Sequence, residues 1–108
     1  MYLYVFRIKH PIGIITTTEY CQGIITAATT RVKPGDIALS RDLEKNYGLK
    51  FGDLIYLDGE TEPYIFRDRM PPEWQQHADI YLRSCKAAEK YGVRKRMAWF
   101  VRKPANQN

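Results

Sequence analysis

Two aspartates in the second half of the chain, Asp68 and Asp79, have the residue type and setting that acid–base chemistry requires. Each is expected at an end of a strand. A carboxyl group that donates a proton near neutral pH needs a raised pKa, which apolar burial or a neighbouring carboxylate provides. Asp79 meets this requirement, because Ala78 and Ile80 flank it. Asp68 lies between two arginines and meets it less well. The alternative for both is structural, since an aspartate at a strand end often caps a turn.

An aromatic residue and a histidine accompany these carboxylates. Trp74 lies in residues 70–76, where adjacent prolines exclude regular structure. Its indole can stack on a sugar ring, and the alternative is an anchor that packs this loop on the rest of the fold. His77 with Asp68 and Asp79 would supply only part of a metal site, so we expect no metal and no cofactor.

The two cysteines, Cys21 and Cys85, show neither a C-x-x-C spacing nor a Cys/His array. A structural zinc site is therefore not expected. The sequence leaves open whether the two residues form a disulfide bond.

Short strands are the elements that must position these residues. In residues 2–9, apolar side chains alternate with charged ones towards the end, which predicts a half-buried strand. Residues 10–13 are expected to turn the chain, because proline cannot donate to a strand ladder and glycine admits a positive φ. A tight hairpin turn is expected at Asp58-Gly59. The further strands expected are 14–20, 37–39, 54–57, 63–67, 78–82 and 97–101.

Two short helices complete the expected elements. The first is a helical turn through 42–45, which Ser40 precedes as a cap. The second runs over 85–91, with Ser84 as its cap and Gly92 as its stop.

Six to eight short strands with one or two short helices predict a mostly β fold, a small barrel or sandwich. A composition of 44% hydrophobic and 27% charged residues is that of a globular protein, which excludes disorder, collagen and coiled coil. The length of 108 residues suits one domain and not two. We expect this domain over 1–103, followed by a disordered tail at 104–108.

The formal net charge of +5 favours polyanionic partners, among them nucleic acid, anionic lipid and a bacterial wall with peptide carboxylates. The basic residues occur as pairs and one triplet, Arg94-Lys-Arg96, which makes nucleic acid the less favoured partner. No segment approaches the ~18 apolar residues of a membrane span, and no signal peptide is expected. The chain as written is expected in the cytoplasm, and it would act at a cell wall only after export, release or phage delivery.

Seven short motifs follow one another over residues 14–102. They are Thr18-Glu-Tyr20, Gly23-Ile-Ile-Thr-Ala27, Val32-Lys-Pro-Gly-Asp-Ile-Ala-Leu39, Phe51-Gly-Asp-Leu-Ile-Tyr-Leu-Asp-Gly59, Arg67-Asp68, Ala78-Asp-Ile-Tyr81 and Lys86-Ala-Ala-Glu-Lys-Tyr-Gly92. In this order they resemble the three-aspartate (3D) domain family of bacterial cell-wall-cleaving proteins. The resemblance implies a six-stranded double-psi β-barrel related to the catalytic domain of membrane-bound lytic transglycosylase A.

The resemblance also implies a function, a lytic transglycosylase that cleaves the glycan strands of peptidoglycan with a single aspartate. Asp79 would protonate the glycosidic oxygen and then accept the proton of the muramyl 6-hydroxyl, so that no catalytic water is needed. Asp68 would be the neighbour that tunes or orients it. The substrate-binding residues implied are Thr18, Tyr20 and Thr26, to which Trp74 is added as a stacking platform.

Three departures from the family's pattern leave a second function open. In the family, an aspartate usually follows the strand that corresponds to Ile37-Ala-Leu39. Ser40 stands in that position here, and Asp42 comes two positions later. Residues 69–76 replace a Gly-rich loop, and Ala28 replaces a glycine. The alternative is therefore a non-catalytic binding or structural barrel, associated with a wall or a phage, that has lost the site.

Overall fold

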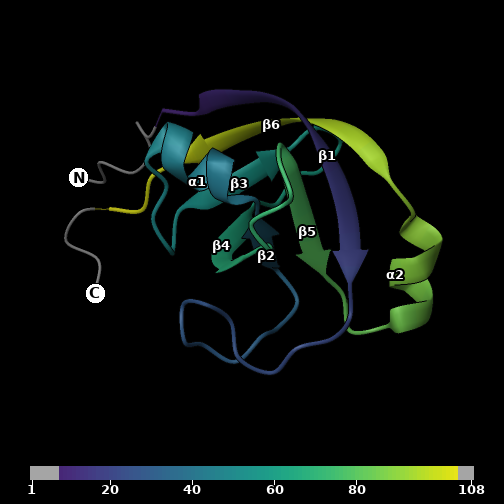
Figure 1. Cartoon of the computed structure of the whole chain (residues 1–108). Helices are drawn as coiled ribbons and strands as arrows, with labels where there is room; N and C mark the ends of the chain where they lie inside the picture. The colour runs from purple at the N-terminus through teal and green to yellow at the C-terminus, as the bar shows by residue number, and fades with distance from the viewer. Residues whose placement is uncertain (1–7, 105–108) are drawn as a thin grey trace.

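The computed structural model describes residues 8–104, in which six strands close into one barrel and two short helices lie outside it (Figure 1). The strands are β1 (His10–Tyr20), β2 (Asp36–Leu39), β3 (Leu54–Leu57), β4 (Tyr64–Arg69), β5 (His77–Tyr81) and β6 (Arg94–Val101). The helices are α1 (Arg41–Tyr47) and α2 (Cys85–Tyr91). The mostly β, six-stranded barrel that the sequence predicts is confirmed.

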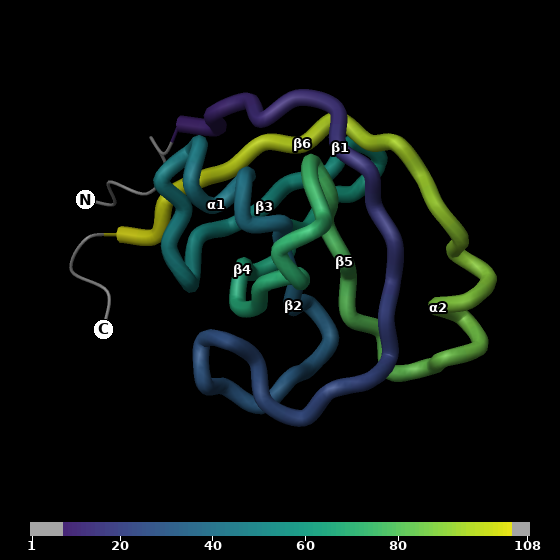
Figure 2. Tube along the Cα trace, in the orientation of Figure 1, coloured from purple at the N-terminus to yellow at the C-terminus, as the bar shows by residue number. Residues whose placement is uncertain are grey.

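The strand order around the barrel is β1-β5-β2-β4-β3-β6, and β6 pairs with β1 to close it. The pairs β1–β5 and β2–β4 are parallel and the other pairs are antiparallel. Parallel neighbours need long crossover connections, so the two strands of each parallel pair come from separate parts of the chain (Figure 2). This crossed order places Thr18 of β1 beside Asp79 of β5.

The barrel interior is filled by apolar side chains, because alternate residues of each strand point inward. In β2, Ile37 and Leu39 belong to this core and are fully buried. Ala38 lies between them and therefore points to the outer face of the barrel. The other large strand residues of the core are Ile15, Ile55, Leu57, Phe66, Ile80 and Phe100.

The turn expected at residues 10–13 is wrong, because β1 continues through this segment. A shift in the pairing of β1 with β6 between Pro11 and Gly13 inserts one extra residue, a β-bulge. Gly13 has a φ of 109°, which a bulge tolerates and which does not end the strand. The strand expected over 2–9 falls outside the described residues except for Ile8 and Lys9, which do not belong to a strand. The tail expected at 104–108 lies outside them too, apart from its first residue.

The β3–β4 hairpin is confirmed, but its turn is longer than expected. Leu54 pairs with Ile65 and Ile55 with Tyr64. The connection therefore spans residues 58–63 rather than the two residues Asp58-Gly59. Pro63 cannot donate to the ladder, and the pairing accordingly begins only after it.

Both helices form where they are expected, but the serines that precede them make different hydrogen bonds. Ser84 Oγ accepts a hydrogen bond of 3.1 Å from the amide of Ala87 and so caps α2. Ser40 holds the same position before α1, but its Oγ accepts from the amide of His77 at 3.0 Å. Gly48 ends α1 in a left-handed conformation with a φ of 60°.

Replacing Ser84 by alanine is expected to lower the free energy of unfolding by about 1 kcal/mol, because α2 loses the acceptor for an otherwise unpaired amide. Urea denaturation measures this change. Ser84→Asn is the matched control, since its side-chain oxygen keeps the cap. A loss of the same size in both variants would show that the cap does not stabilise α2.

A disulfide bond between Cys21 and Cys85 answers the question that the sequence leaves open. Cys21 directly follows β1, and Cys85 is the first residue of α2. Just before the bond, the amide of Leu82 donates to the carbonyl of Tyr20 at 2.7 Å. The disulfide thus fastens α2 to the end of the parallel β1–β5 pair.

Candidate functional site

The two predicted catalytic aspartates lie on the same outer face of the barrel. Ala38 of β2 pairs with Asp79 of β5 on one side and with Asp68 of β4 on the other. A register shift in the β2–β4 pair, between Ile37↔Phe66 and Ala38↔Asp68, inserts Arg67 as an extra residue, so Asp68 lies opposite Ala38 and not on the inward side with Phe66. Residues opposite one another on neighbouring strands point to the same face of a sheet. The carboxylates therefore flank the small side chain of Ala38, with their backbones two strand spacings or roughly 10 Å apart. Both side chains are half-buried.

Asp79 has the environment that an acid needs. Burial raises the pKa of its carboxyl group above the ordinary value, and a hydrogen bond from Thr18 opposes this rise. Thr18 Oγ1 donates to Asp79 Oδ1 at 2.9 Å. Burial is the cause expected from the apolar neighbours of Asp79 in the sequence. The charge of Asp68 is not among the causes of the raised pKa of Asp79. Asp79 as a residue is only half-buried, so residues 70–76 do not seal it completely from solvent.

Tyr20 lies near both aspartates. Burial raises the pKa of its hydroxyl strongly, and the negative charges of Asp68 and Asp79 add to the rise. Its ring meets that of Tyr81, its neighbour on β5, edge to face at 5.4 Å between centroids. Within the described residues, the Tyr20 hydroxyl is buried and has no hydrogen-bond partner. A buried hydroxyl of this kind is usually satisfied by a buried water molecule.

His77 is a member of the site that sequence analysis considered only as a partial metal ligand. Its Nε2 lies 2.9 Å from Thr18 Oγ1, the atom that also contacts Asp79. Burial lowers the pKa of the imidazole, and the positive charge of Lys95 lowers it further. The two-residue spacing from Asp79 was the available signal, because alternate residues of a strand share one face.

Trp74 extends the site towards solvent. The indole is 45% exposed, whereas His77, which it contacts edge to face at 4.8 Å, is only 6% exposed. The loop residue thus both packs on the barrel and presents an open aromatic surface. The two alternatives that the sequence offered for Trp74, a platform and an anchor, are compatible.

Asp68 makes contacts that fit a structural role. Its Oδ1 accepts hydrogen bonds from the amides of Ala27 at 3.0 Å and Arg69 at 2.9 Å. The amide of Ala28 also donates to the carbonyl of Arg67 at 2.9 Å. These bonds attach the long connection between β1 and β2 to strand β4. Asp68 therefore shapes the rim of the site as well as contributing charge to it.

Thr26 was also predicted to bind substrate, but it lies in the β1–β2 connection and not on a strand of the site. Its side chain is 4% exposed, and its Oγ1 lies 2.8 Å from Thr30 Oγ1 within the β1–β2 connection. This pair maintains the shape of the connection, and the Thr26 hydroxyl is not open to a ligand.

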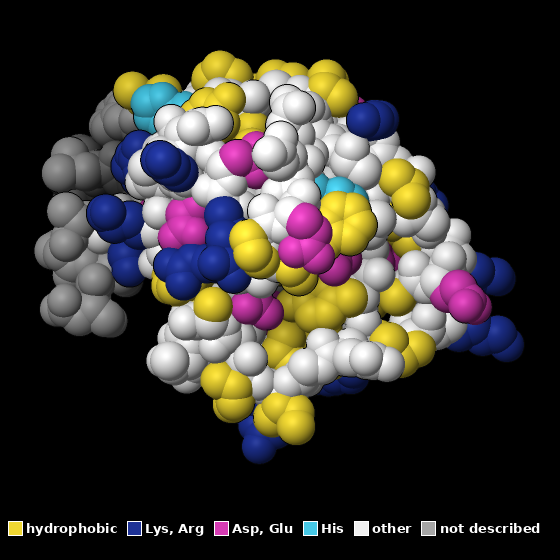
Figure 3. All heavy atoms as spheres, viewed as in Figure 1, with side chains coloured by type: hydrophobic (Ala, Val, Ile, Leu, Met, Phe, Trp, Pro, Cys, Tyr) yellow, Lys and Arg dark blue, Asp and Glu magenta, His cyan; other side chains and the backbone are white. Residues whose placement is uncertain are grey.

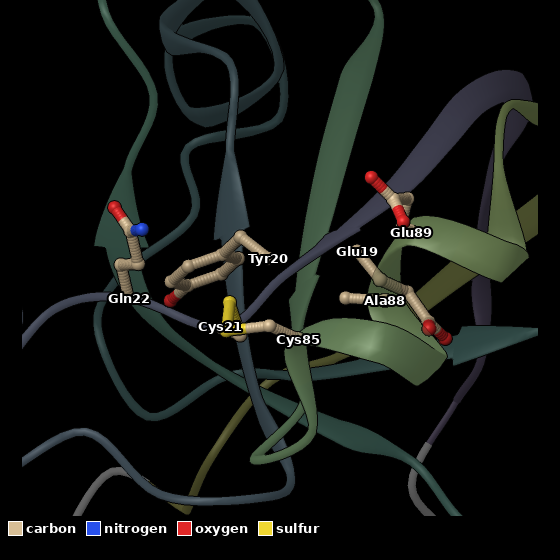
Figure 4. Close-up of a pocket in the computed structure, with 7 residues that line it drawn as sticks. All are labelled: Glu19, Tyr20, Cys21, Gln22, Cys85, Ala88 and Glu89. Carbon is tan, nitrogen blue, oxygen red and sulfur yellow. A yellow bond between two sulfur atoms is a disulfide. The ribbon is translucent and has the colours of Figure 1, made fainter.

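A recess separates the β1–β2 connection from the rest of this face. Figure 3 shows hydrophobic side chains in its floor and acidic ones along its upper rim. A second hollow, a pocket of about 350 Å³, lies beside Tyr20 at the end of β1. Figure 4 shows the Tyr20 ring next to the disulfide in this pocket. Its lining comprises Glu19, Tyr20, Cys21, Gln22, Cys85, Ala88 and Glu89.

Replacing Lys95 by methionine is expected to raise the pKa of His77, because Lys95 Nζ, which donates to Thr16 at 3.0 Å, lowers it by charge repulsion. NMR titration of the imidazole measures the change. Lys86→Met on the exposed face of α2 is the control that removes an equal charge elsewhere. An unchanged His77 titration in Lys95→Met would exclude this interaction.

Among residues 8–104, no group of three His, Cys, Asp or Glu side chains is arranged to hold a metal ion. The same part of the chain contains no helix with the length and apolar character needed to cross a membrane. Comparison with protein-family models and with curated proteins finds no match to this chain.

Proposed function

We propose that this protein is a peptidoglycan lytic transglycosylase related to the 3D domain family, with Asp79 as its single acid–base residue. The observation that supports this most strongly is the setting of Asp79. Its carboxyl group lies on an accessible outer face, and burial raises its pKa. A carboxyl group in this setting retains its proton at a higher pH than an exposed one and can donate it.

The proposed reaction uses this group twice. Asp79 first protonates the glycosidic oxygen, and the bond from that oxygen to the anomeric carbon of the muramyl residue breaks. The resulting carboxylate then accepts the proton of the muramyl 6-hydroxyl as its oxygen bonds to the same carbon. The products are a 1,6-anhydromuramyl end and a free hydroxyl, and no water is consumed. Hydrolysis by glycosidases would instead call on two carboxyl groups and a water molecule.

The neighbouring side chains fit a sugar chain laid across this face. Trp74 presents an exposed indole for stacking on a sugar ring. The transition state carries positive charge on the sugar ring, and the negative charge of Asp68 on the same face would stabilise it.

A second function, a wall- or phage-associated barrel that binds glycan without cleaving it, is favoured by two observations. Ser40, in the position of the family's missing aspartate, is fully buried and bonded to the amide of His77. Asp68 uses one carboxylate oxygen to hold backbone amides of Ala27 and Arg69. Both arrangements would persist in a barrel that had lost its activity.

Incubation with purified peptidoglycan followed by mass spectrometry separates the two functions. A transglycosylase produces 1,6-anhydromuramyl ends, a hydrolase produces reducing ends, and a binding module produces neither. Pelleting with sacculi at increasing salt completes the test, because attraction by net charge alone weakens with ionic strength. Binding that survives high salt without new glycan ends would support the binding module and contradict the enzyme.

A further inference from the structure

We infer that His77 is a positioning residue that acts through Thr18 and thereby determines which oxygen of Asp79 carries the acidic proton. The inference rests on the proposed function for its catalytic meaning. Its structural basis is a continuous set of hydrogen bonds from the imidazole to the carboxylate. Thr18 Oγ1 lies 2.9 Å from His77 Nε2 and 2.9 Å from Asp79 Oδ1.

The direction of these bonds follows from counting protons. A threonine hydroxyl has one hydrogen, so it can donate only one of its two bonds. While Asp79 is ionised, its carboxylate can only accept, and the Thr18 hydrogen therefore points to Oδ1. The bond between Thr18 and His77 must then be donated by the imidazole, which requires the tautomer with its hydrogen on Nε2.

This direction leaves the second oxygen of Asp79 for the acidic proton. When Asp79 gains its proton, His77 Nε2 still donates to Thr18, so the single Thr18 hydrogen keeps Oδ1 as its acceptor. A carboxylic acid accepts through its carbonyl oxygen, which is then Oδ1. The proton accordingly resides on Oδ2, which has no hydrogen-bond partner among the described residues. The acid is thus held with one oxygen bound to the protein and the protonated one free to meet a glycosidic oxygen.

The surroundings of His77 fix its ring in the orientation that this requires. Its backbone amide donates to Ser40 Oγ at 3.0 Å, and its carbonyl accepts from the Ser40 amide at 2.9 Å. Trp74 packs against the ring, and the side chain is almost fully buried. Ser40, which stands where the 3D family usually has an aspartate, is therefore one of the groups that hold the positioning residue in place.

Charged groups around this set of bonds do not break it. The positive charge of Lys95 on β6 lowers the pKa of His77 and so favours its neutral form. The negative charge of Asp79 adds to the raised pKa of Glu19 and of Tyr20 on β1. Protonation of His77 at low pH adds a hydrogen to Nδ1 and leaves Nε2 a donor. The Thr18 hydroxyl thus remains directed to Asp79 in both protonation states of the imidazole.

The test measures the titration midpoint of the Asp79 carboxyl carbon by NMR, without substrate. Thr18→Val should raise it, because the carboxylate loses a donor. His77→Leu should raise it in the same direction by freeing the Thr18 hydroxyl to rotate. The double variant should titrate as Thr18→Val does, since both changes act through one hydroxyl.

Two further variants and one direct observation complete the test. His77→Gln should return the midpoint towards that of the unaltered protein, because the glutamine amide can donate from the position of Nε2. His10→Leu, which alters the histidine that stacks on Phe100, is the matched control and should leave the midpoint unchanged. Nitrogen-15 shifts of the His77 ring should show its hydrogen on Nε2 in the unaltered protein, so the test does not depend on any variant folding.

An unchanged midpoint in His77→Leu, additive shifts in the double variant, or a ring hydrogen on Nδ1 would each overturn the inference. These outcomes are separate from those of the proposed function, because no glycan is present. A protein that shows the expected shifts and releases no anhydromuramyl ends would retain the positioning of the Asp79 proton and lose the proposed reaction.

Discussion

Asparagine at position 79 is expected to lower the rate of 1,6-anhydromuramyl formation by about 10²–10⁴-fold, the usual contribution of a positioned acid–base group. The amide keeps the size of the side chain and can accept from Thr18, but it cannot donate the glycosidic proton. Asp68→Asn should lower this rate less. Ala38 separates the Asp68 carboxylate from Asp79, and that carboxylate also accepts hydrogen bonds from backbone amides. Equal and small losses in both variants would mean that neither carboxylate is catalytic.

The effect of Asp79→Asn on stability is the control for its effect on activity. Burial raises the folded-state pKa of Asp79, so the carboxylate form weakens the fold as pH rises through that pKa. Asp79→Asn should therefore unfold at a temperature no lower than the unaltered protein at pH 7, and any gain should vanish at a pH below the ordinary carboxyl pKa. Asp58→Asn, an exposed aspartate of the β3–β4 connection, is the matched variant and should leave activity unchanged. An Asp79→Asn protein that unfolds at pH 7 would indicate a structural role.

Reduction of the Cys21–Cys85 disulfide is the change with the largest expected effect on stability. The bond joins residues separated by 64 positions, and the chain-entropy relation gives a loss of about 4 kcal/mol for a loop of this length. Denaturant unfolding with and without a thiol reductant measures it. The double variant Cys21→Ser/Cys85→Ser should match the reduced protein and show no response to reductant. A reductant effect that persists in this variant would assign the loss to another cause.

The local parts of the fold are those that the sequence predicts well. Ser84 and Gly92 bound α2 as expected, because capping depends on residues within one or two turns. The strands of the hairpin follow from alternation of apolar and polar residues. The wrong prediction of a turn at residues 10–13 arises because a contact between distant parts of the chain decides the structure there. Proline and glycine there signal a local turn, and the pairing with β6 overrides this signal by forming a bulge.

The candidate site was predictable in its residue types and not in its connections. Asp79 was identified from its apolar neighbours, and the structure attributes the raised pKa to the burial that these neighbours suggested. The link from His77 through Thr18 depends on the parallel pairing of β1 with β5, 61 residues apart for the Thr18–Asp79 bond. No pattern within a short window of sequence reports such a pairing. The burial of Thr26 has a different origin, because its hydroxyl is paired with Thr30 inside an irregular connection that no strand or helix pattern describes.

The strand order of the barrel also constrains how the chain folds. Around the barrel, strands from the first half, β1 to β3, alternate strictly with strands from the second half, β4 to β6. Among the strands of residues 8–104, neither half therefore contains a pair of neighbours, and a nascent chain that ends before β4 has none of these strand ladders to form. The barrel must wait for the second half to leave the ribosome, and closing these long loops makes its folding slow. For the same reason, two fragments separated within residues 58–63 would each present only unpaired strands, and each would supply every neighbour that the other lacks.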